Sequence, residues 1–401
     1  MSASSEGPLN LMLICGEPSG DQLGAQLMVR LKELAGDAVK FTGVGGPAMA
    51  AHGLQSLFPL DATAVMGLRE VVPRIPEILR RVRTASDFAL STRPDAVVCI
   101  DSPDFTHRIA QRLHRLGANI PTVNYVAPQV WASRQYRARK MARYFDLVLA
   151  LLPFETPFFE TRGLRAHFVG HPVVERTDRI SGGVALRERL GIAVGARVLA
   201  ILPGSRMSEV RLLLPIFREA VAAISAIIPD LACIMPAVPH LAPLIRELAQ
   251  GWPSPLHIVE SEADKFAAFH TADAALAASG TVTTELALAG VPMVVAYRLG
   301  WLTYLLVRPI VRVPHITLVN LLLKREAVPE FIQNRCRADL LAEAVLRLLQ
   351  NADARQQQKR DLREAVHLLG IDDEKPSLRA ARALLDFVRE GRANQRRSSG
   401  T

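Results

Sequence analysis

The sequence predicts an α/β protein made of two parallel-sheet domains, and three observations carry this prediction. The chain has 401 residues, more than one ordinary hydrophobic core holds. Short apolar runs alternate with amphipathic helical patterns, which is typical of parallel sheets covered by helices on both faces. A polar stretch at 173–183 ends in two glycines and interrupts the alternation, so we interpret it as the linker between the domains.

The first series of elements opens with an apolar strand at 9–15, a glycine-containing turn at 16–21 and a helix through Leu34. Further strands of this series are expected at 40–46, 96–101, 121–126, 145–153 and 167–172. Because helical patterns separate most of these strands, we expect them to pair in parallel.

The second series opens with a strand and turn at 197–205, followed by an amphipathic helix from about 209 to 228. Further strands are expected at 231–238, 256–260, 273–279 and 292–298. The predicted domains cover 1–175 and 184–345, and they are followed by carboxyl-terminal helices at 346–392 and a disordered basic tail at 393–401.

Composition restricts the class of protein. Hydrophobic residues make up 49% of the chain and charged residues 22%, which is typical of a globular protein. The net charge of +9 favours anionic partners such as nucleotides, phosphorylated substrates, a lipid surface or nucleic acid. An RNA-binding protein is disfavoured, because aromatic residues make up only 5% of the chain and no basic, aromatic strand platform is evident.

Four cysteines and the absence of long apolar runs indicate a cytoplasmic protein. Cys15, Cys99, Cys233 and Cys336 are far apart and lack metal-ligand spacing, so reduced buried thiols are expected and no metal site is. No secretory signal is evident, and no apolar run reaches the roughly 18 residues of a membrane span. Any contact with a membrane is therefore expected to be peripheral.

The stretch ALAASGTVTTELALAGVPMVVAY, at 275–297, predicts a strand, a tight turn, a short helix and another strand. The turn Ser279-Gly280-Thr281 precedes the helix, whose amino terminus offers unpaired N–H groups and partial positive charge to an anion. Glu285 lies one turn into the helix, where a carboxylate can accept hydrogen bonds from sugar hydroxyls. Together these residues predict a nucleotide site.

A second turn of the same kind lies at LPGSR, at 202–206, between a strand and a helix. Ser205 adds a donor, and the guanidinium of Arg206 is suited to a diphosphate. Taken alone, this turn is better explained as a plain strand-to-helix connection with a surface arginine. Two such turns in one domain favour a diphosphate held between them, whereas dinucleotide and P-loop fingerprints are absent.

Carboxylates mark the turns of the first domain. In CGEPSGD, at 15–21, Gly16 and Gly20 allow close backbone approach, and Glu17 and Asp21 are suited to sugar hydroxyls or proton transfer. Helix capping by Ser19 and a favourable helix-dipole contact of Asp21 explain the same residues.

Asp101 ends the apolar strand in CIDSPDF, at 99–105, where a carboxylate can take a proton from an incoming hydroxyl. Asp104 is better explained as a cap of the following helix. Asp101 is therefore the predicted general base, with Glu17 as a second catalytic candidate.

The segment 65–83 mixes apolar and basic residues at helical spacing. Its candidate membrane or acceptor contacts are Met66, Val71, Val72, Ile75, Ile78 and Leu79. Basic amphipathic helices lie on anionic membranes, but a helix packed on its own core with a solvated basic face shows the same pattern. The sequence leaves both interpretations open.

Taken together, the motifs resemble the lipid-A-disaccharide synthase family of inverting GT-B glycosyltransferases. The resemblance extends from residue 16 to about residue 333 and rests on GEPSGD, VMGLREV, CIDSPDF, YVAPQVW, LALLPFE, FVGHP, LPGSRMSEV, ASGTVTTELAL, PMVVAYR and VNLL. It implies two Rossmann-like domains with a cleft between them. It also implies transfer of 2,3-diacylglucosamine from UDP-2,3-diacylglucosamine to 2,3-diacylglucosamine 1-phosphate, giving the β-1,6-linked disaccharide 1-phosphate and UDP in lipid A synthesis.

The resemblance further implies no metal or other cofactor, no nucleic-acid partner, and a cytoplasmic protein bound peripherally to the inner membrane. Many members form homodimers, so the carboxyl-terminal helices either pack across the domains or are exchanged between subunits. Asp101 matches the proposed general base of the family and Arg206 the arginine on the UDP diphosphate. Glu285 matches the ribose-binding acid, and Ser279, Gly280 and Thr281 match the nucleotide loop. Asn320 in VNLL matches a nucleotide-side asparagine.

Three positions depart from the family pattern. Asn124 and Ser133 replace a histidine and a tryptophan of the YVAPQVW region, and Val319 replaces the proline before Asn320. A rival enzyme on the same scaffold is a UDP-N-acetylglucosamine 2-epimerase, which needs no lipid-facing surface. The basic amphipathic segment at 65–83 argues against that rival.

Overall fold

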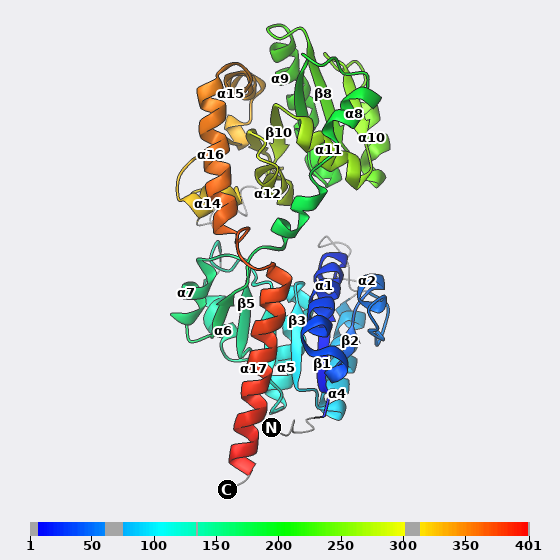
Figure 1. Cartoon of the computed structure of the whole chain (residues 1–401), viewed down its shortest axis with the longest axis vertical. Coiled ribbons are helices and arrows are strands. Elements are labelled where there is room, and N and C mark those ends of the chain that lie inside the picture. Colours follow the sequence, from blue (N-terminus) through cyan, green and yellow to red (C-terminus); the bar gives the residue numbers. More distant parts are fainter. Residues whose placement is uncertain (1–6, 61–74, 134, 301–312, 400–401) are drawn as a thin grey trace. The chain divides into compact units, whose positions relative to one another are not determined.

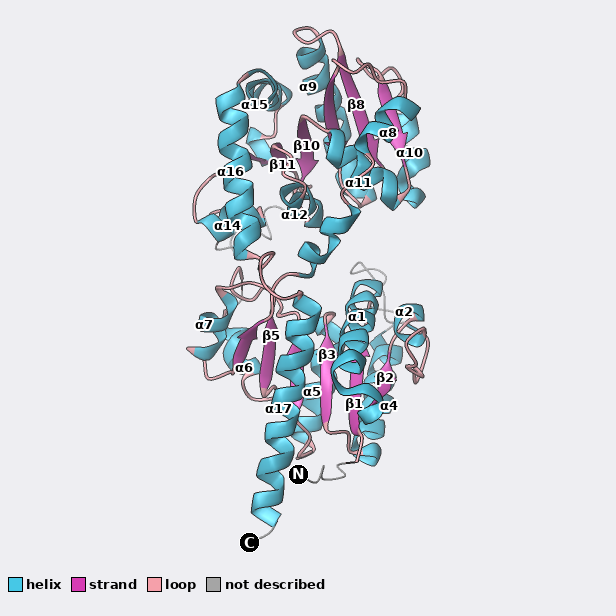
Figure 2. Cartoon of the chain, in the orientation of Figure 1, coloured by secondary structure: helices cyan, strands magenta, loops and turns pink. Residues whose placement is uncertain are grey.

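The computed structural model describes residues 7–60, 75–133, 135–300 and 313–399. Met66, Val71 and Val72 lie outside the described residues. The chain forms two compact units. Unit 1 comprises the chain up to Pro172 together with the residues from Asp372 onward, and unit 2 runs from Val173 to Ile371. In each unit the strands lie side by side with helices around them (Figure 2).

Unit 1 is built on a six-stranded parallel sheet in the order β2-β1-β3-β4-β5-β6 (Figure 1). Its strands are β1 (Leu9–Cys15), β2 (Val39–Val44), β3 (Ala96–Ile100), β4 (Thr122–Tyr125), β5 (Leu147–Ala150) and β6 (Ala166–Phe168). Its helices are α1 (Pro18–Ala35), α2 (Pro47–Ala50), α4 (Ile75–Thr92), α5 (Pro103–Arg115), α6 (Tyr136–Met141), α7 (Glu155–Glu160) and α17 (Pro376–Ser399), with a 3₁₀ turn η1 (Gly36–Ala38).

Unit 2 has a second six-stranded parallel sheet in the order β12-β11-β10-β7-β8-β9. Its strands are β7 (Arg197–Leu202), β8 (Leu231–Pro236), β9 (Leu256–Val259), β10 (Ala274–Ala278), β11 (Met293–Tyr297) and β12 (Glu330–Ile332). Its helices are α8 (Gly183–Arg189), α9 (Met207–Ser225), α10 (Ala242–Leu248), α11 (Glu262–Thr271), α12 (Thr281–Leu288), α14 (Leu318–Leu323), α15 (Ala338–Gln350) and α16 (Ala352–Leu368). Three short 3₁₀ helices complete the set: η4 (Pro172–Arg179), η5 (Pro239–Leu241) and η6 (Gln333–Arg335).

The predicted α/β class with two parallel sheets is confirmed, and its cause is visible in the strands. All residues of β3 and β10 are buried, as expected for strands covered on both faces. Helix α9 packs the apolar face that contains Leu213 and Phe217 into the core of unit 2. Such continuous apolar runs, each followed by a helix, leave few arrangements other than a parallel sheet.

The order of the strands locates one topological switch point in each unit. In unit 1, β1 lies between β2 and β3, because the chain passes from β1 to β2 on one side and then crosses to β3 on the other side of β1. In unit 2, β7 lies between β8 and β10 in the same way. Turns at the carboxyl ends of the strands flanking a switch point form the usual ligand site of open α/β sheets.

The last helix, α17, belongs to unit 1 and packs against α1 (Figure 1). Arg392 forms two 2.6 Å bonds to the Asp95 carboxylate, and Arg379 donates to the Phe168 carbonyl at 2.8 Å. The structure differs here from the predicted disordered tail, because α17 continues to Ser399. The stretch RANQRRSS contains no glycine or proline before Gly400, so nothing in it ends the helix that Arg392 anchors.

The four cysteines are buried and unpaired, as predicted. Burial raises the pKa of the Cys15 thiol to about 12, so this thiol is held in its neutral form. Among the described residues, no helix is both long and apolar enough to cross a membrane.

Candidate active site

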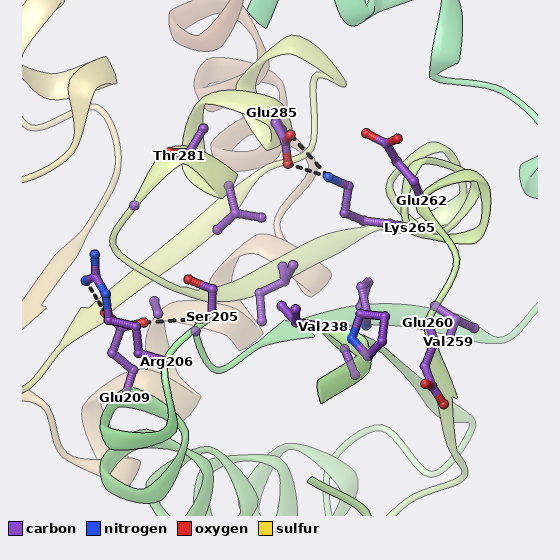
Figure 3. Close-up of a pocket in the computed structure, with 18 of the residues that line it drawn as sticks. Ser205, Arg206, Glu209, Val238, Val259, Glu260, Glu262, Lys265, Thr281 and Glu285 are labelled. Atoms are coloured by element: carbon purple, nitrogen blue, oxygen red, sulfur yellow. Dashed lines mark hydrogen bonds and ion pairs between the residues drawn. The ribbon is translucent and has the colours of Figure 1, made fainter. Parts of the chain in front are cut away.

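A pocket of about 500 Å³ opens at the carboxyl ends of β7, β8 and β10 in unit 2 (Figure 3). Six of the seven residues predicted to bind the nucleotide line this pocket: Ser205, Arg206, Ser279, Gly280, Thr281 and Glu285. They meet because β10 pairs with β7 in register, with Ala277 opposite Leu202, so the turns that follow the two strands are neighbours. The switch point of the sheet therefore brings two sequence-distant motifs together.

The turn after β7 is organised around Glu209, which sequence reasoning missed. One Glu209 oxygen accepts the Ser205 N–H at 3.1 Å, and the other accepts the Arg206 guanidinium at 2.9 Å. Gly204 has φ +120°, and a Cβ there would lie 2.6 Å from Glu209, so only glycine allows this approach. The donors predicted for a diphosphate hold an internal carboxylate in this structure, and Arg206 remains 63% exposed.

The turn after β10 presents the start of α12 to the pocket. Thr281 is the first residue of the helix, and the first N–H groups of a helix have no intrahelical acceptor. A Cβ at Gly280 would meet no protein atom within 4 Å. The Ser279 hydroxyl donates to the Ile316 carbonyl over a long 3.4 Å. This turn therefore offers backbone donors and a partial positive charge to an anion.

Glu285 lies at the pocket wall with only 5% of its side chain exposed. The Lys265 ammonium donates to both of its oxygens, at 3.1 Å and 3.0 Å, and the Arg176 guanidinium bonds one of them. Sequence reasoning missed both cations. Lys265 is 20 residues and Arg176 109 residues from Glu285 in the chain, so no local pattern links them.

The structure does not bring Asn320 to the pocket. Its side chain is fully buried and makes four bonds of 2.8 Å, donating to Val328 and Glu330 and accepting the N–H groups of Ala327 and Val328. These bonds tie α14 to the loop before β12. Asn320 therefore does not line the pocket, and its side chain holds the loop before β12.

In unit 1, Glu17 and Asp101 follow β1 and β3, the two strands at the switch point. The Ser19 hydroxyl donates to Asp101 at 3.0 Å. Burial, together with the nearby Asp101 carboxylate, raises the pKa of Glu17 above its ordinary value. A pair of carboxylates in which one has a raised pKa is typical of a site that moves protons.

The glycines of the first turn have a different role from the predicted one. A Cβ at Gly16 would lie 2.8 Å from the Ser102 side chain, and one at Gly20 would lie 2.9 Å from Cys15. These glycines let the turn pack on its own protein neighbours. This packing, and not the close approach of an anion, explains why glycine stands at both positions. Their packing places Glu17 and Ser19 beside Asp101.

The interpretation of Asp21 is also corrected. Its carboxylate is buried and accepts the N–H groups of Gly46, Ala48 and Met49, at 2.8, 2.9 and 3.0 Å. It therefore binds the start of α2 and is not available as a competing base.

The backbone that carries Asp101 is strained. Asp101 and Ser102 have φ values of +53° and +46°, a region that residues with a side chain rarely adopt. Val126, at the end of the neighbouring strand β4, has φ +73°. The buried hydroxyl of Thr106 donates to the Asp101 carbonyl at 2.7 Å. Strain of this kind persists where the surroundings fix it, and it clusters at functional sites.

Of the candidate membrane residues, three are described. On α4, Ile75 is 43% exposed and Leu79 40% exposed, whereas Ile78 packs against the core of unit 1. The helix thus has an inward face and exposed apolar side chains as well. Among the described residues, no cluster of His, Cys, Asp and Glu side chains could hold a metal ion.

Comparison with known proteins gives the family. A family model described as lipid-A-disaccharide synthetase matches residues 11–382. The lipid-A-disaccharide synthase of Rhodospirillum centenum is 50% identical over 381 residues, which cover 95% of each chain.

Solved structures support the fold alone. A putative UDP-N-acetylglucosamine 2-epimerase from Listeria monocytogenes has a TM-score of 0.64 at 15% identity, covering 97% of this chain and 98% of that one. MurG of Acinetobacter baumannii has a TM-score of 0.57 at 15% identity, covering 96% and 100%. The fold is therefore that of GT-B glycosyltransferases and related epimerases, and the chain belongs to the lipid-A-disaccharide synthase family of glycosyltransferases.

Proposed function

We propose that this glycosyltransferase joins UDP-2,3-diacylglucosamine to 2,3-diacylglucosamine 1-phosphate, giving the β-1,6-linked disaccharide 1-phosphate and UDP. The pocket of unit 2 is the observation that carries the proposal. It gathers two turns with donors suited to an anion, and the carboxylate of Glu285, from separate parts of the sequence. Membership of the family supports the identity of the substrates.

The donor nucleotide is proposed to bind in this pocket. The Ser205 N–H, the Arg206 guanidinium and the start of α12 would bind the diphosphate, and Glu285 would accept ribose hydroxyls. As the bond to the sugar breaks, negative charge develops on the departing UDP. The N–H groups at the start of α12, and the Arg206 guanidinium once it turns from Glu209, can stabilise such charge, so we propose that the reaction needs no metal ion.

Asp101 is proposed as the general base. The acceptor hydroxyl is a poor nucleophile and must lose a proton as it attacks the anomeric carbon, and a positioned carboxylate accelerates such a step about 10²–10⁴-fold. Attack on the face opposite the departing UDP inverts the configuration at that carbon. Glu17, whose pKa is raised by burial and by the nearby Asp101 carboxylate, is the second candidate for proton transfer.

Peripheral binding to the cytoplasmic face of the inner membrane, through α4, belongs to the same proposal. Its support is the pair of exposed apolar side chains, Ile75 and Leu79, on a helix with exposed Arg80 and Arg83. Changing Ile75 and Leu79 together to serine should release the protein from anionic vesicles in a sedimentation assay, and unchanged sedimentation would rule this surface out. We also propose a homodimer, as is common in the family, and light scattering tests it.

Incubation with the two lipid substrates, followed by mass spectrometry, tests the function. We expect the disaccharide 1-phosphate and UDP in equal amounts, and a β configuration at the new linkage by NMR. UDP-N-acetylglucosamine serves as the control substrate. Its epimerisation, together with unchanged lipid substrates, would show that the chain is an epimerase instead.

A further inference from the structure

Lys265 stands out in the nucleotide pocket as a charged residue without a role in the proposed reaction. It lies on α11, its side chain is 25% exposed, and it reaches toward Glu285 across the pocket wall (Figure 3). Its ammonium also lies 4.5 Å from the ring centroid of Phe266, next to it in the chain. The simplest explanation is an ion pair that stabilises the fold.

The ion pair alone does not use all the hydrogen-bonding capacity of Lys265 and Glu285. A carboxylate has about four acceptor sites, and an ammonium has three donors. One oxygen of Glu285 accepts from both Arg176 and Lys265, while the other accepts from Lys265 alone. Within the described part of the chain, the pair therefore keeps roughly one acceptor site on Glu285 and one donor on Lys265.

One donor and one acceptor side by side match two adjacent hydroxyl groups. In a vicinal diol, one hydroxyl can donate to the carboxylate while its neighbour accepts from the ammonium. Hydrogen bonds to charged groups are stronger than neutral ones, and a site built for a hydroxyl rejects an analogue without it.

We infer that Lys265 binds the ribose directly, so that the Lys265–Glu285 pair forms hydrogen bonds with both ribose hydroxyls and selects ribonucleotides. This inference rests on the proposed binding of UDP in the pocket. Arg176 provides a matched contrast. It is the other cation on Glu285, but it does not line the pocket. It can influence Glu285 without contacting a ligand there.

Calorimetry with UDP, 2′-deoxy-UDP and 3′-deoxy-UDP tests the inference on the full-length protein. Wild type should bind UDP about tenfold or more tightly than each deoxy analogue, as expected for lost hydrogen bonds to charged groups. In Lys265→Met, the affinity for UDP should fall, and the difference in affinity between UDP and one of the two deoxy analogues should largely disappear. Arg176→Met should keep the difference in affinity for both analogues. Lys265→Gln, which stays polar, serves as a second variant if Lys265→Met does not fold.

Pyrophosphate, which has no ribose, separates ribose recognition from general attraction to a diphosphate. Its affinity should be nearly the same in wild type and Lys265→Met. An equal loss for pyrophosphate and UDP would show that Lys265 binds phosphate, and unchanged discrimination in both Lys265 variants would show a purely structural ion pair. Either outcome overturns the inference while UDP binding stands. Failure of UDP to bind wild type would instead overturn the proposed donor site.

Discussion

At the scale of single residues, the Arg206–Glu209 pair shows that an internal carboxylate holds the donors of the pocket. The Glu209 carboxylate occupies the Ser205 N–H and the Arg206 guanidinium, which are the donors proposed for the diphosphate. An anion bound there must compete with this internal carboxylate. Because Arg206 is 63% exposed, its side chain can turn from Glu209 to a ligand without disturbing the core.

Replacing Arg206 with alanine should therefore weaken UDP binding. A hydrogen bond to a charged group is worth about 1.5–3 kcal/mol, but water screens an exposed side chain, so we expect a loss near tenfold. Calorimetry measures it. Arg211→Ala is the control, because Arg211 is an exposed arginine on α9, the helix that follows Arg206, and lies outside the pocket. An unchanged UDP affinity in folded Arg206→Ala would remove Arg206 from the site.

The Asp101→Asn variant tests the general base. Asparagine keeps the shape of aspartate but cannot take the proton, so turnover should fall by about 10²–10⁴-fold while UDP affinity stays nearly unchanged. Glu17→Gln should lower turnover less. Asp21→Asn should mainly lower stability, because that carboxylate binds three backbone N–H groups. If Asp101→Asn keeps more than about a tenth of wild-type turnover, another group is the base.

At the scale of elements, a buried hydroxyl helps the backbone hydrogen bonds to hold the turn between β3 and α5. Thr106 is fully buried and donates to the carbonyls of Asp101 and Ser102, at 2.7 Å and 3.1 Å. Both of those residues have positive φ. The helix thus holds the strained turn that presents Asp101, and this makes Thr106 a positioning residue.

Thr106→Val removes the hydroxyl but keeps the volume of the side chain. We expect kcat to fall between about tenfold and a hundredfold, as expected when a catalytic group is misplaced. UDP affinity should be unchanged, because the nucleotide pocket belongs to unit 2. Thr106→Ser, which keeps the hydroxyl, should restore most of kcat. A loss of stability without a change in kcat would show that the hydroxyl serves only the fold.

Local pattern predicted most of the elements, but it missed β12 (Glu330–Ile332) and several contacts. Apolar runs such as 274–278, followed by a turn and a helix, predict a parallel strand and its ligand-binding end. Lys265 and Arg176 could not be found in this way, because they meet Glu285 only in the folded chain. Asn320 was placed at the nucleotide through resemblance, whereas its buried hydrogen bonds give it a structural role.

At the scale of the whole molecule, the same design is used twice. Each unit has a six-stranded parallel sheet with a switch point, and each switch point gathers the polar residues of two turns. The departure at Asn124 lies in the core of unit 1, on β4 opposite Cys99 of β3. Its side chain is fully buried and contacts His107 at 3.4 Å inside unit 1.

Two buried groups of unit 1 make stability depend on pH in opposite directions. Burial lowers the pKa of His107 to about 4, from an ordinary value of 6.5. Between these values the unfolded chain binds more protons than the folded one, so this group lowers stability as the pH falls through that window. Burial raises the pKa of Glu155 from 4.5 to about 7. In that window the folded chain binds more protons, so this group lowers stability as the pH rises.

The windows overlap between about pH 4.5 and 6.5, so the two contributions largely cancel in wild type. Single variants should separate them. In Glu155→Gln the stability should rise as the pH increases from 4.5 to 6.5, by up to about 3 kcal/mol from His107. In His107→Gln the stability should fall over the same range by a similar amount, because only Glu155 remains. Urea unfolding at a series of pH values measures both slopes, and parallel pH profiles for the two variants would contradict this account of their burial.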